Sequence, residues 1–361
     1  MPLIAHNQLP TFERLRENGQ TILSKEAAQH QDIRELHIGL LNMMPDAALA
    51  ATERQFFRLI GESNPIAQFY VHTFTLPQLE RGAKAQQRID SYYETFDDIQ
   101  RDGLDALIIT GANVAGSELC NQPFWEPLME VVNWAAENVT STLCSCLATH
   151  AVLEFRYAQK RVLQPEKIWG VFPHRVVNSQ HPLVTDINTR FDVPHSRWNA
   201  VSREQFDAAG LITLVESDVG VHLATSPDGI RFVFFQGHQE YDTISLLKEY
   251  KRDLSLYHQG KSKHCPPFPQ NYFSARQQSI LNEYNSRMAR TNKDTLEHKT
   301  AAVAFPEHLI APHLDNTWHD TAEAVVGNWI GCVYQITHTD RRLPYMDHVD
   351  PDNPLGLAHG K

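Results

Sequence analysis

Residues 141–150 have the sequence STLCSCLATH, and residues 234–242 have the sequence FFQGHQEYD. In each stretch a short apolar run, typical of a buried strand, ends at a turn and is followed by a helical pattern. The first turn carries Cys146, and the second carries His238 and Glu240. In α/β folds such turns gather at the carboxyl ends of the strands. The two stretches therefore predict the fold class and one cleft in which these three side chains meet.

The three residue types suit nucleophilic catalysis. A thiol is mostly protonated at neutral pH, so acyl transfer needs an imidazole to take its proton and an acid to orient the imidazole. Because alternate residues of an extended segment face the same side, His238 and Glu240 are expected to point together towards Cys146. The amide of Leu147, at the helix N-terminus, is the predicted oxyanion donor.

A simpler interpretation remains open for each residue taken alone. A cysteine in an apolar strand is usually a small core residue, and a lone histidine is seldom catalytic. Cys144 lies on the same strand face as Cys146 and competes for the role of nucleophile. We favour Cys146 because it lies at the predicted junction, whereas Cys144 lies inside the strand.

Strand-like and helical segments alternate along the chain. This order predicts a mostly parallel, doubly wound α/β sheet, flavodoxin-like, with helical additions. The expected strands are residues 35–42, 68–74, 104–110, 141–146, 220–225 and 231–236, and the expected helices are residues 47–61, 123–138, 147–159 and 243–256. The glycine-containing turn at residues 110–116 lacks dinucleotide-binding spacing. It is either a plain turn or the source of a second backbone N–H for the oxyanion.

The domain organisation expected from these patterns is one α/β domain over residues 1–345. Residues 274–313 are polar and form a predicted helical insertion, and the apolar segment 325–336 is expected to lie against the main domain. Residues 346–361 are expected to form a flexible C-terminal tail.

Composition narrows the classes of function. The chain has 361 residues and a net charge of −11 with no basic run, which argues against nucleic-acid and anionic membrane partners. Five cysteines, an odd and sparse set, indicate a reducing cytoplasm, and no apolar run is long enough to span a membrane. The nineteen histidines are scattered without zinc-ligand spacing, so we expect no metal.

Ordered sequence motifs extend over most of residues 1–273 and again over about 314–340. They are LNMMP at 41–45, TGA at 110–112, STL at 141–143 with Cys146, Lys167 with GV at 170–171, PHSR at 194–197, GH at 237–238 with EYD at 240–242, RD at 252–253, and NW at 328–329 with VYQIT at 333–337. In these motifs the chain resembles the MetA-type homoserine O-acyltransferases, usually called homoserine O-succinyltransferases. The fold of that family is similar to the class I glutamine amidotransferases.

The resemblance implies an activity and roles for matching residues. It implies acyl transfer from an acyl-CoA co-substrate to the hydroxyl of L-homoserine in methionine biosynthesis, by a cytoplasmic homodimer without a bound cofactor. Cys146 matches the acyl-thioester nucleophile, His238 the proton acceptor and Glu240 its partner. The residues implied in binding the amino acid are Lys167, Ser196 and Arg252. A guanidinium suits that task because it holds a carboxylate through two parallel hydrogen bonds.

The chain departs from the family pattern at three places. Ala115 matches the loop position where acetyl-CoA users carry glutamate and succinyl-CoA users carry glycine, and a small neutral residue there favours succinyl. Asp46 and Ala47 stand where the family has a lysine pair, and the stretch 273–314 is longer than usual. O-acetyl transfer and serine as the acceptor therefore remain alternatives.

Two other classes of function also remain open. A glutaminase or amidase-type cysteine hydrolase uses the same residue types, although Cys144 and Ala148 stand where its Gly-x-Cys-x-Gly motif has glycines. A non-catalytic binding module is the third possibility, which the missing lysine pair supports.

Overall fold

The computed structural model describes residues 3–20, 22–29, 33–64, 67–114, 116, 118–294 and 304–357, with side chains omitted for 290–294. The strands are β1 (Leu3–Ala5), β2 (Ile22–Ser24), β3 (Glu35–Leu41), β4 (Gln68–Phe74), β5 (Ala106–Ile109), β6 (Ser141–Ser145), β7 (Val162–Val176), β8 (Arg190–Ala200), β9 (Ile212–Ser217), β10 (Gly220–Thr225) and β11 (Phe232–Phe235). The helices are α1 (Pro10–Glu17), α2 (Lys25–Gln29), α3 (Asp46–Ser63), α4 (Ala83–Tyr92), α5 (Phe96–Asp102), α6 (Trp125–Asn138), α7 (Leu147–Tyr157), α8 (Arg203–Ala208), α9 (Ser245–His258), α10 (Ala275–Asp294), α11 (Glu307–Ile310) and α12 (His319–Ile336), with 3-10 turns η1 (Pro182–Val184) and η2 (Ala311–His313).

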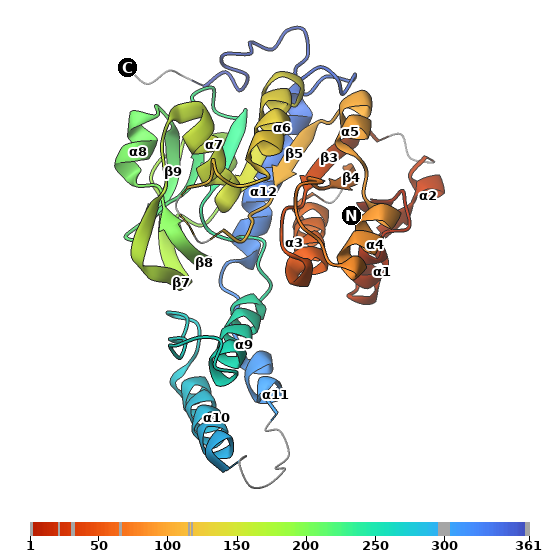
Figure 1. The fold of residues 1–361 in the computed structure, drawn as a ribbon. Coiled ribbons are helices and arrows are strands. Elements are labelled where there is room, and N and C mark those ends of the chain that lie inside the picture. Colours follow the sequence, from red (N-terminus) through yellow and green to blue (C-terminus); the bar gives the residue numbers. More distant parts are fainter. Residues whose placement is uncertain are drawn as a thin grey trace.

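These strands form one sheet in the order β2-β1-β4-β3-β5-β6-β11-β10-β9-β7-β8 (Figure 1). The strands from β2 to β11 are parallel to their neighbours, so the prediction of a mostly parallel sheet is confirmed. The other four strands, β10, β9, β7 and β8, are antiparallel. A short turn joins β10 to β11, and so short a connection permits only antiparallel pairing.

The sequence patterns missed the long ribbon of β7 and β8. Both strands carry many charged or polar residues, and β7 exposes Val162 and Leu163, so neither strand shows a clean apolar run. Pairing with each other over most of their length, and of β7 with β9, holds them in the sheet. This ribbon carries Lys167 and Ser196.

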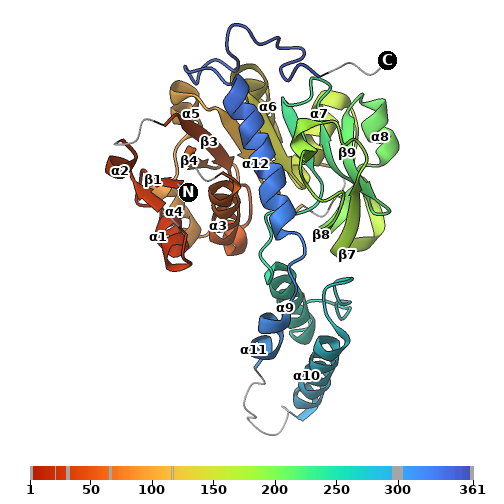
Figure 2. The same ribbon diagram turned by 180° about the vertical axis from the view of Figure 1, so that it is seen from behind.

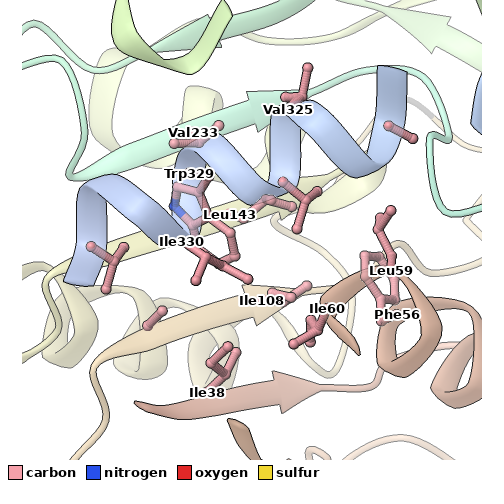
Figure 3. Packing of buried hydrophobic residues seen from close by; sticks show 14 of the residues in the cluster. Ile38, Phe56, Leu59, Ile60, Ile108, Leu143, Val233, Val325, Trp329 and Ile330 are labelled. Carbon is pink, nitrogen blue, oxygen red and sulfur yellow. The ribbon is translucent and has the colours of Figure 1, made fainter. Parts of the chain in front are cut away.

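Helices cover both faces of the parallel half, as predicted for a doubly wound sheet. Residues of α1, α3 and α12 pack on the face of the sheet that carries Ala106 and Ile108 of β5. Residues of α6 and α7 pack on the opposite face, which carries Leu107 and Ile109. Figure 3 shows Trp329 of α12 on the side of the helix that faces the sheet, close to Leu143 of β6. The indole N–H of Trp329 donates a 2.8 Å hydrogen bond to Ser141. The prediction that segment 325–336 lies on the main domain is therefore confirmed.

A helical projection extends from this body, built from α9, α10 and α11 (Figures 1 and 2). Its helices share a small core that includes Tyr250, Leu254, Leu281 and Ile310 and continues to Trp169 of β7. The expected insertion, residues 274–313, contains α10, α11 and η2, whereas α9 precedes it and residues 295–303 lie outside the described part of the chain. Among the helices of the described residues, none combines the length and the hydropathy needed to cross a bilayer.

Part of the expected C-terminal tail lies against the body. Val349 and Leu355 of this tail pack against the main core, in which Tyr345, the last residue before the tail, is buried. The guanidinium of Arg231 also donates a hydrogen bond to the carbonyl of Pro351. Residues 346–357 therefore contribute side chains to the fold, which their sequence pattern did not predict.

Candidate active site

Cys146 occupies the sharp turn between β6 and α7. Its backbone has φ 52° and ψ −106°, a conformation that is rare for a residue with a side chain. The turn is held by a 2.7 Å hydrogen bond from the Cys146 amide to the carbonyl of Phe235, at the end of β11. Cys146 is partly exposed, whereas Cys144 is fully buried and its burial raises the pKa of its thiol. Of these two cysteines, only the one at the junction reaches the surface.

His238 and Glu240 meet one turn beyond β11. The Nδ1 atom of His238 lies 2.7 Å from Oε1 of Glu240, and both side chains are almost fully buried. The expected extended segment is wrong, because β11 ends at Phe235 and residues 239–240 form a turn. The amide of His238 donates to the carbonyl of Pro194, which fixes the start of this turn.

Electrostatic interactions join His238 to the sulfur of Cys146. Burial alone lowers the pKa of His238, but the Glu240 carboxylate and then the Cys146 sulfur, through charge and a hydrogen bond, raise it well above its usual range. Two guanidinium groups also interact with this sulfur: burial lowers the pKa of Arg197 to about 10 and also lowers that of Arg161, while Cys146 acts in the opposite direction. Both arginines stay charged at neutral pH, so they place positive charge near this sulfur.

The backbone around the sulfur suits an oxyanion. Leu147 is the first residue of α7, so its N–H has no partner within the helix. A Cβ placed on Gly111, just after β5, would lie 3.8 Å from that nitrogen and 3.6 Å from the Cβ of Cys146. The loop after β5 therefore approaches the predicted oxyanion position through Gly111. Ala115, the predicted acyl-donor residue, lies outside the described residues.

A cleft of about 350 Å³ opens beside this group. Its walls come from the start of α3, the end of β5, the turn after β11 and one face of α9. The lining residues are Met44, Pro45, Ala47, Ala48, Ala51, Thr52, Gln55, Phe56, Thr110, Gly111, His238, Glu240, Tyr241, Asp242, Ser245, Lys248, Glu249 and Arg252. Where the related family has its lysine pair, this wall is apolar, and Asp46 instead accepts a 2.8 Å hydrogen bond from the amide of Gly82.

Two of the three predicted substrate-binding residues, Lys167 and Ser196, bind the same carboxylate. The ammonium of Lys167 lies 3.3 Å from the carboxylate of Glu249, and the hydroxyl of Ser196 donates to the same oxygen at 2.6 Å. The hydroxyl of Tyr241 donates to the other oxygen at 2.7 Å. Burial raises the pKa of Glu249, but Lys167 and then these hydrogen bonds outweigh it and lower the pKa overall.

Glu249 was missed by the sequence patterns, although it lies three residues before Arg252 on one face of α9. Arg252 lines the cleft and pairs with Asp253 at 2.8 Å. Lys248, on the same helix, also lines the cleft and is exposed. Its ammonium makes no ion pair with the residues that the structure describes. Helix α9 thus presents one anchored carboxylate, that of Glu249, and two cationic side chains, Lys248 and Arg252, to the cleft.

The chain is similar in sequence to one known family of proteins. The sequence model of the family described as homoserine O-succinyltransferase matches residues 2–339. The chain is similar to a homoserine O-succinyltransferase of Thiobacillus denitrificans, with 66% identity over 99% of this chain and 100% of the relative. A homoserine O-succinyltransferase of Allochromatium vinosum is 64% identical over 100% of both chains. A glutamine amidotransferase structure from Methylobacillus flagellatus aligns at 13% identity and a TM-score of 0.43, covering 88% of this chain and 98% of that one.

Proposed function

The chain belongs to the homoserine O-succinyltransferase family, and on this premise we propose that it transfers a succinyl group to the hydroxyl of L-homoserine through a thioester on Cys146, in methionine biosynthesis. One observation carries the thioester step. Cys146, in its strained turn, interacts with the buried pair of His238 and Glu240 beside the cleft.

In the first half-reaction the Cys146 thiolate attacks the thioester carbonyl of an acyl-CoA. The amides of Leu147 and of the loop that begins at Gly111 are placed to stabilise the oxyanion, in a site where fixed dipoles cost no reorganisation. Coenzyme A leaves with the proton of His238, and the succinyl group stays on the sulfur. Glu240 holds the imidazole in position throughout.

In the second half-reaction neutral His238 takes the proton of the homoserine hydroxyl. The alkoxide attacks the thioester, a second oxyanion forms, and its collapse releases O-succinylhomoserine. Cys146 leaves as a thiolate beside protonated His238, which restores the starting state. The high pKa of His238 suits this cycle because the protonated imidazole stabilises the thiolate.

The charges in the cleft allow both substrates to be oriented. Glu249, ionised and fixed by Lys167 and Ser196, binds the ammonium group of homoserine, and Arg252 binds its carboxylate. Lys248 then remains for the free carboxylate of the succinyl group, beside the apolar wall of Ala47 and Ala48. Acetyl lacks that carboxylate, so this arrangement favours a succinyl donor.

The proposal also includes the setting of the enzyme. A reducing cytoplasm is supported by the five cysteines, which are all unpaired. A homodimer is proposed from the family resemblance alone.

Intact-mass measurement tests the central step. The purified chain, incubated with succinyl-CoA alone, is expected to gain the mass of one succinyl group, and addition of L-homoserine is expected to remove it. Cys146→Ser is the matched control and should gain nothing. An enzyme that forms product at full rate without any adduct at Cys146 would overturn the thioester mechanism, and a protein that releases ammonia from glutamine would support the hydrolase alternative.

A further inference from the structure

Three side chains from separate segments converge around β1 and β4, which lie towards the β2 edge of the sheet, away from β6 and β11. They are His6, which follows β1, His72 of β4, and Glu94, which lies between α4 and α5. One nitrogen or oxygen atom from each lies within 4.8 Å of the others. The Nδ1 of His72 is 2.8 Å from Oε1 of Glu94, and the Nε2 of His6 is 3.9 Å from the same oxygen. None of the three lines the catalytic cleft.

The hydrogen bonds of His6 fix its tautomer. Its Nδ1 lies 3.2 Å from the carbonyl of Ile4. A carbonyl oxygen only accepts hydrogen bonds, so Nδ1 carries the proton and Nε2 keeps its lone pair. The Asn7 amide approaches that lone pair at 3.3 Å, a weak contact that a stronger electrophile can replace. His6 thus presents the form of imidazole that binds metal ions.

A chain of contacts extends from His72 to a second carboxylate. The Nε2 of His72 lies 2.8 Å from Nδ1 of His37, whose Nε2 lies 3.2 Å from Glu35. His37 thus lies behind His72, and Glu35 lies behind His37, so both are outer partners of the cluster formed by His6, His72 and Glu94.

We propose that a zinc ion is bound by Nε2 of His6, Nδ1 of His72 and the carboxylate of Glu94. Two imidazoles and one carboxylate are a zinc ligand set, and water completes a tetrahedron. Mg²⁺ and Ca²⁺ prefer sites made of oxygen ligands. Zinc bonds of about 2.0–2.1 Å hold ligand atoms roughly 3.4 Å apart, so Glu94 and His6 need shifts on the order of 1 Å.

The outer contacts are those that orient zinc ligands in proteins. With zinc on Nδ1, His72 donates its Nε2 proton to His37, and His37 donates its own to Glu35. The free nitrogen of His6 is held by the carbonyl of Ile4. Each imidazole ligand thus has a partner on its other nitrogen, which fixes its orientation and raises its basicity.

The ion would join three segments that lie far apart in the sequence. Strand β1 has only three residues, and its pairing with β4 rests on a single register pair, Leu3 with Phe69. Zinc would link the residue after β1 directly to β4 and to the turn before α5. Its role is therefore structural, and the acyl-transfer site is separate from it.

Metal titration of the full chain tests this proposal. The Cys146→Ser background is used throughout because the catalytic thiolate also binds zinc. After chelator treatment, this parent should bind one Zn²⁺ in calorimetry, show the visible absorption of tetrahedral Co²⁺, and gain thermal stability with Zn²⁺. His6→Phe, which keeps the ring shape, and Glu94→Gln should each abolish all three signals while keeping a native circular dichroism spectrum.

Two further variants distinguish a built site from adventitious binding. Glu35 is exposed, contacts His37 and is not one of the three proposed zinc ligands. Glu35→Gln removes the charge of this outer partner and should weaken Zn²⁺ binding about 10–100-fold. His319→Gln is the matched control, since His319, Glu62 and Glu323 form a second cluster of similar composition. Binding should survive this change. A parent that binds no Zn²⁺, or binding that persists in both Glu94→Gln and His6→Phe, overturns the proposal.

Discussion

The hydroxyl of Ser196 donates a 2.6 Å hydrogen bond to the carboxylate of Glu249, 53 residues further along the chain. Lys167 and Tyr241 bind the same carboxylate. Four groups that the sequence presents separately thus form one anchored anion at the cleft. We propose that Lys167 and Ser196 are positioning residues that act through Glu249.

Glu249→Gln should impair the second half-reaction and spare the first. The variant loses a charge-assisted contact to the amino acid, worth about 1.5–3 kcal/mol, so kcat/KM for homoserine should fall roughly 10–100-fold. Acylation by succinyl-CoA alone, followed by intact mass, should stay near the wild-type rate. Ser196→Ala should show a smaller effect of the same kind, and an acylation defect equal to the homoserine defect would contradict this role.

The two neighbouring cysteines should differ completely in function. Cys146→Ser is expected to form no thioester, whereas Cys144→Ala should acylate normally because Cys144 is buried in β6 and reaches no substrate. Cys144→Ala should instead lower the free energy of unfolding, since shortening a buried side chain leaves a small cavity. Acylation assays and thermal melts of both variants check this, and loss of acylation in Cys144→Ala would reverse our assignment.

Gly111→Ala tests the loop that faces the oxyanion. The new methyl group would make ordinary contacts of 3.6 Å with Cys146 and 3.8 Å with the Leu147 nitrogen, so the fold should be kept. It would nevertheless occupy space in front of that amide, and loss of one oxyanion donor typically costs about 10²–10³ in rate. Single-turnover acylation should show this loss. Gly116→Ala, in the same loop with open space around its Cβ, is the control.

Lys248→Ala should discriminate between acyl donors. If the ammonium binds the free carboxylate of succinyl, KM for succinyl-CoA should rise about tenfold, a modest value because the side chain is exposed. Turnover of acetyl-CoA, which lacks the carboxylate, should not change. Lys251→Ala is the matched control, because Lys251 is bound to Glu307 outside the cleft. Equal effects on both donors would rule out this contact.

Stability should fall when the pH drops below the ordinary histidine pKa. Burial lowers the pKa of His150 to about 3 and those of His195 and His222 well below 6.5. These rings stay neutral in the folded chain but take up protons when it unfolds. Each ring therefore lowers the free energy of unfolding by roughly 1.4 kcal/mol at one pH unit below 6.5.

His238 acts in the opposite sense, because its pKa is raised in the folded state and its contribution is present below 6.5. It offsets about one of the three, and burial also lowers the pKa of His37 to about 2 and those of His174 and His181 to about 4. The free energy of unfolding should therefore decrease by at least about 3 kcal/mol between pH 7.5 and 5.5. Denaturant titrations at the two pH values measure this difference. Equal stability at both would mean that the three rings are not held neutral.

The sequence by itself determined five strands of the parallel half of the sheet, without β1 and β2, and the junction at Cys146. Local hydrophobic periodicity records which faces of a segment are buried, and the segments 68–74 and 220–225 match their strands β4 and β10 in full. The turn at Cys146 follows from the same signal, because an apolar strand must end where a helical pattern begins.

Only the tertiary structure decided which distant side chains meet. The ribbon of β7 and β8 shows no local signal because long-range pairing holds it, and that ribbon brings Lys167 and Ser196 to Glu249. The convergence of His6, His72 and Glu94 likewise comes from three segments with no regular spacing. Contacts between such residues depend on how elements are arranged in space, and the periodicity of a single segment carries no information about that arrangement.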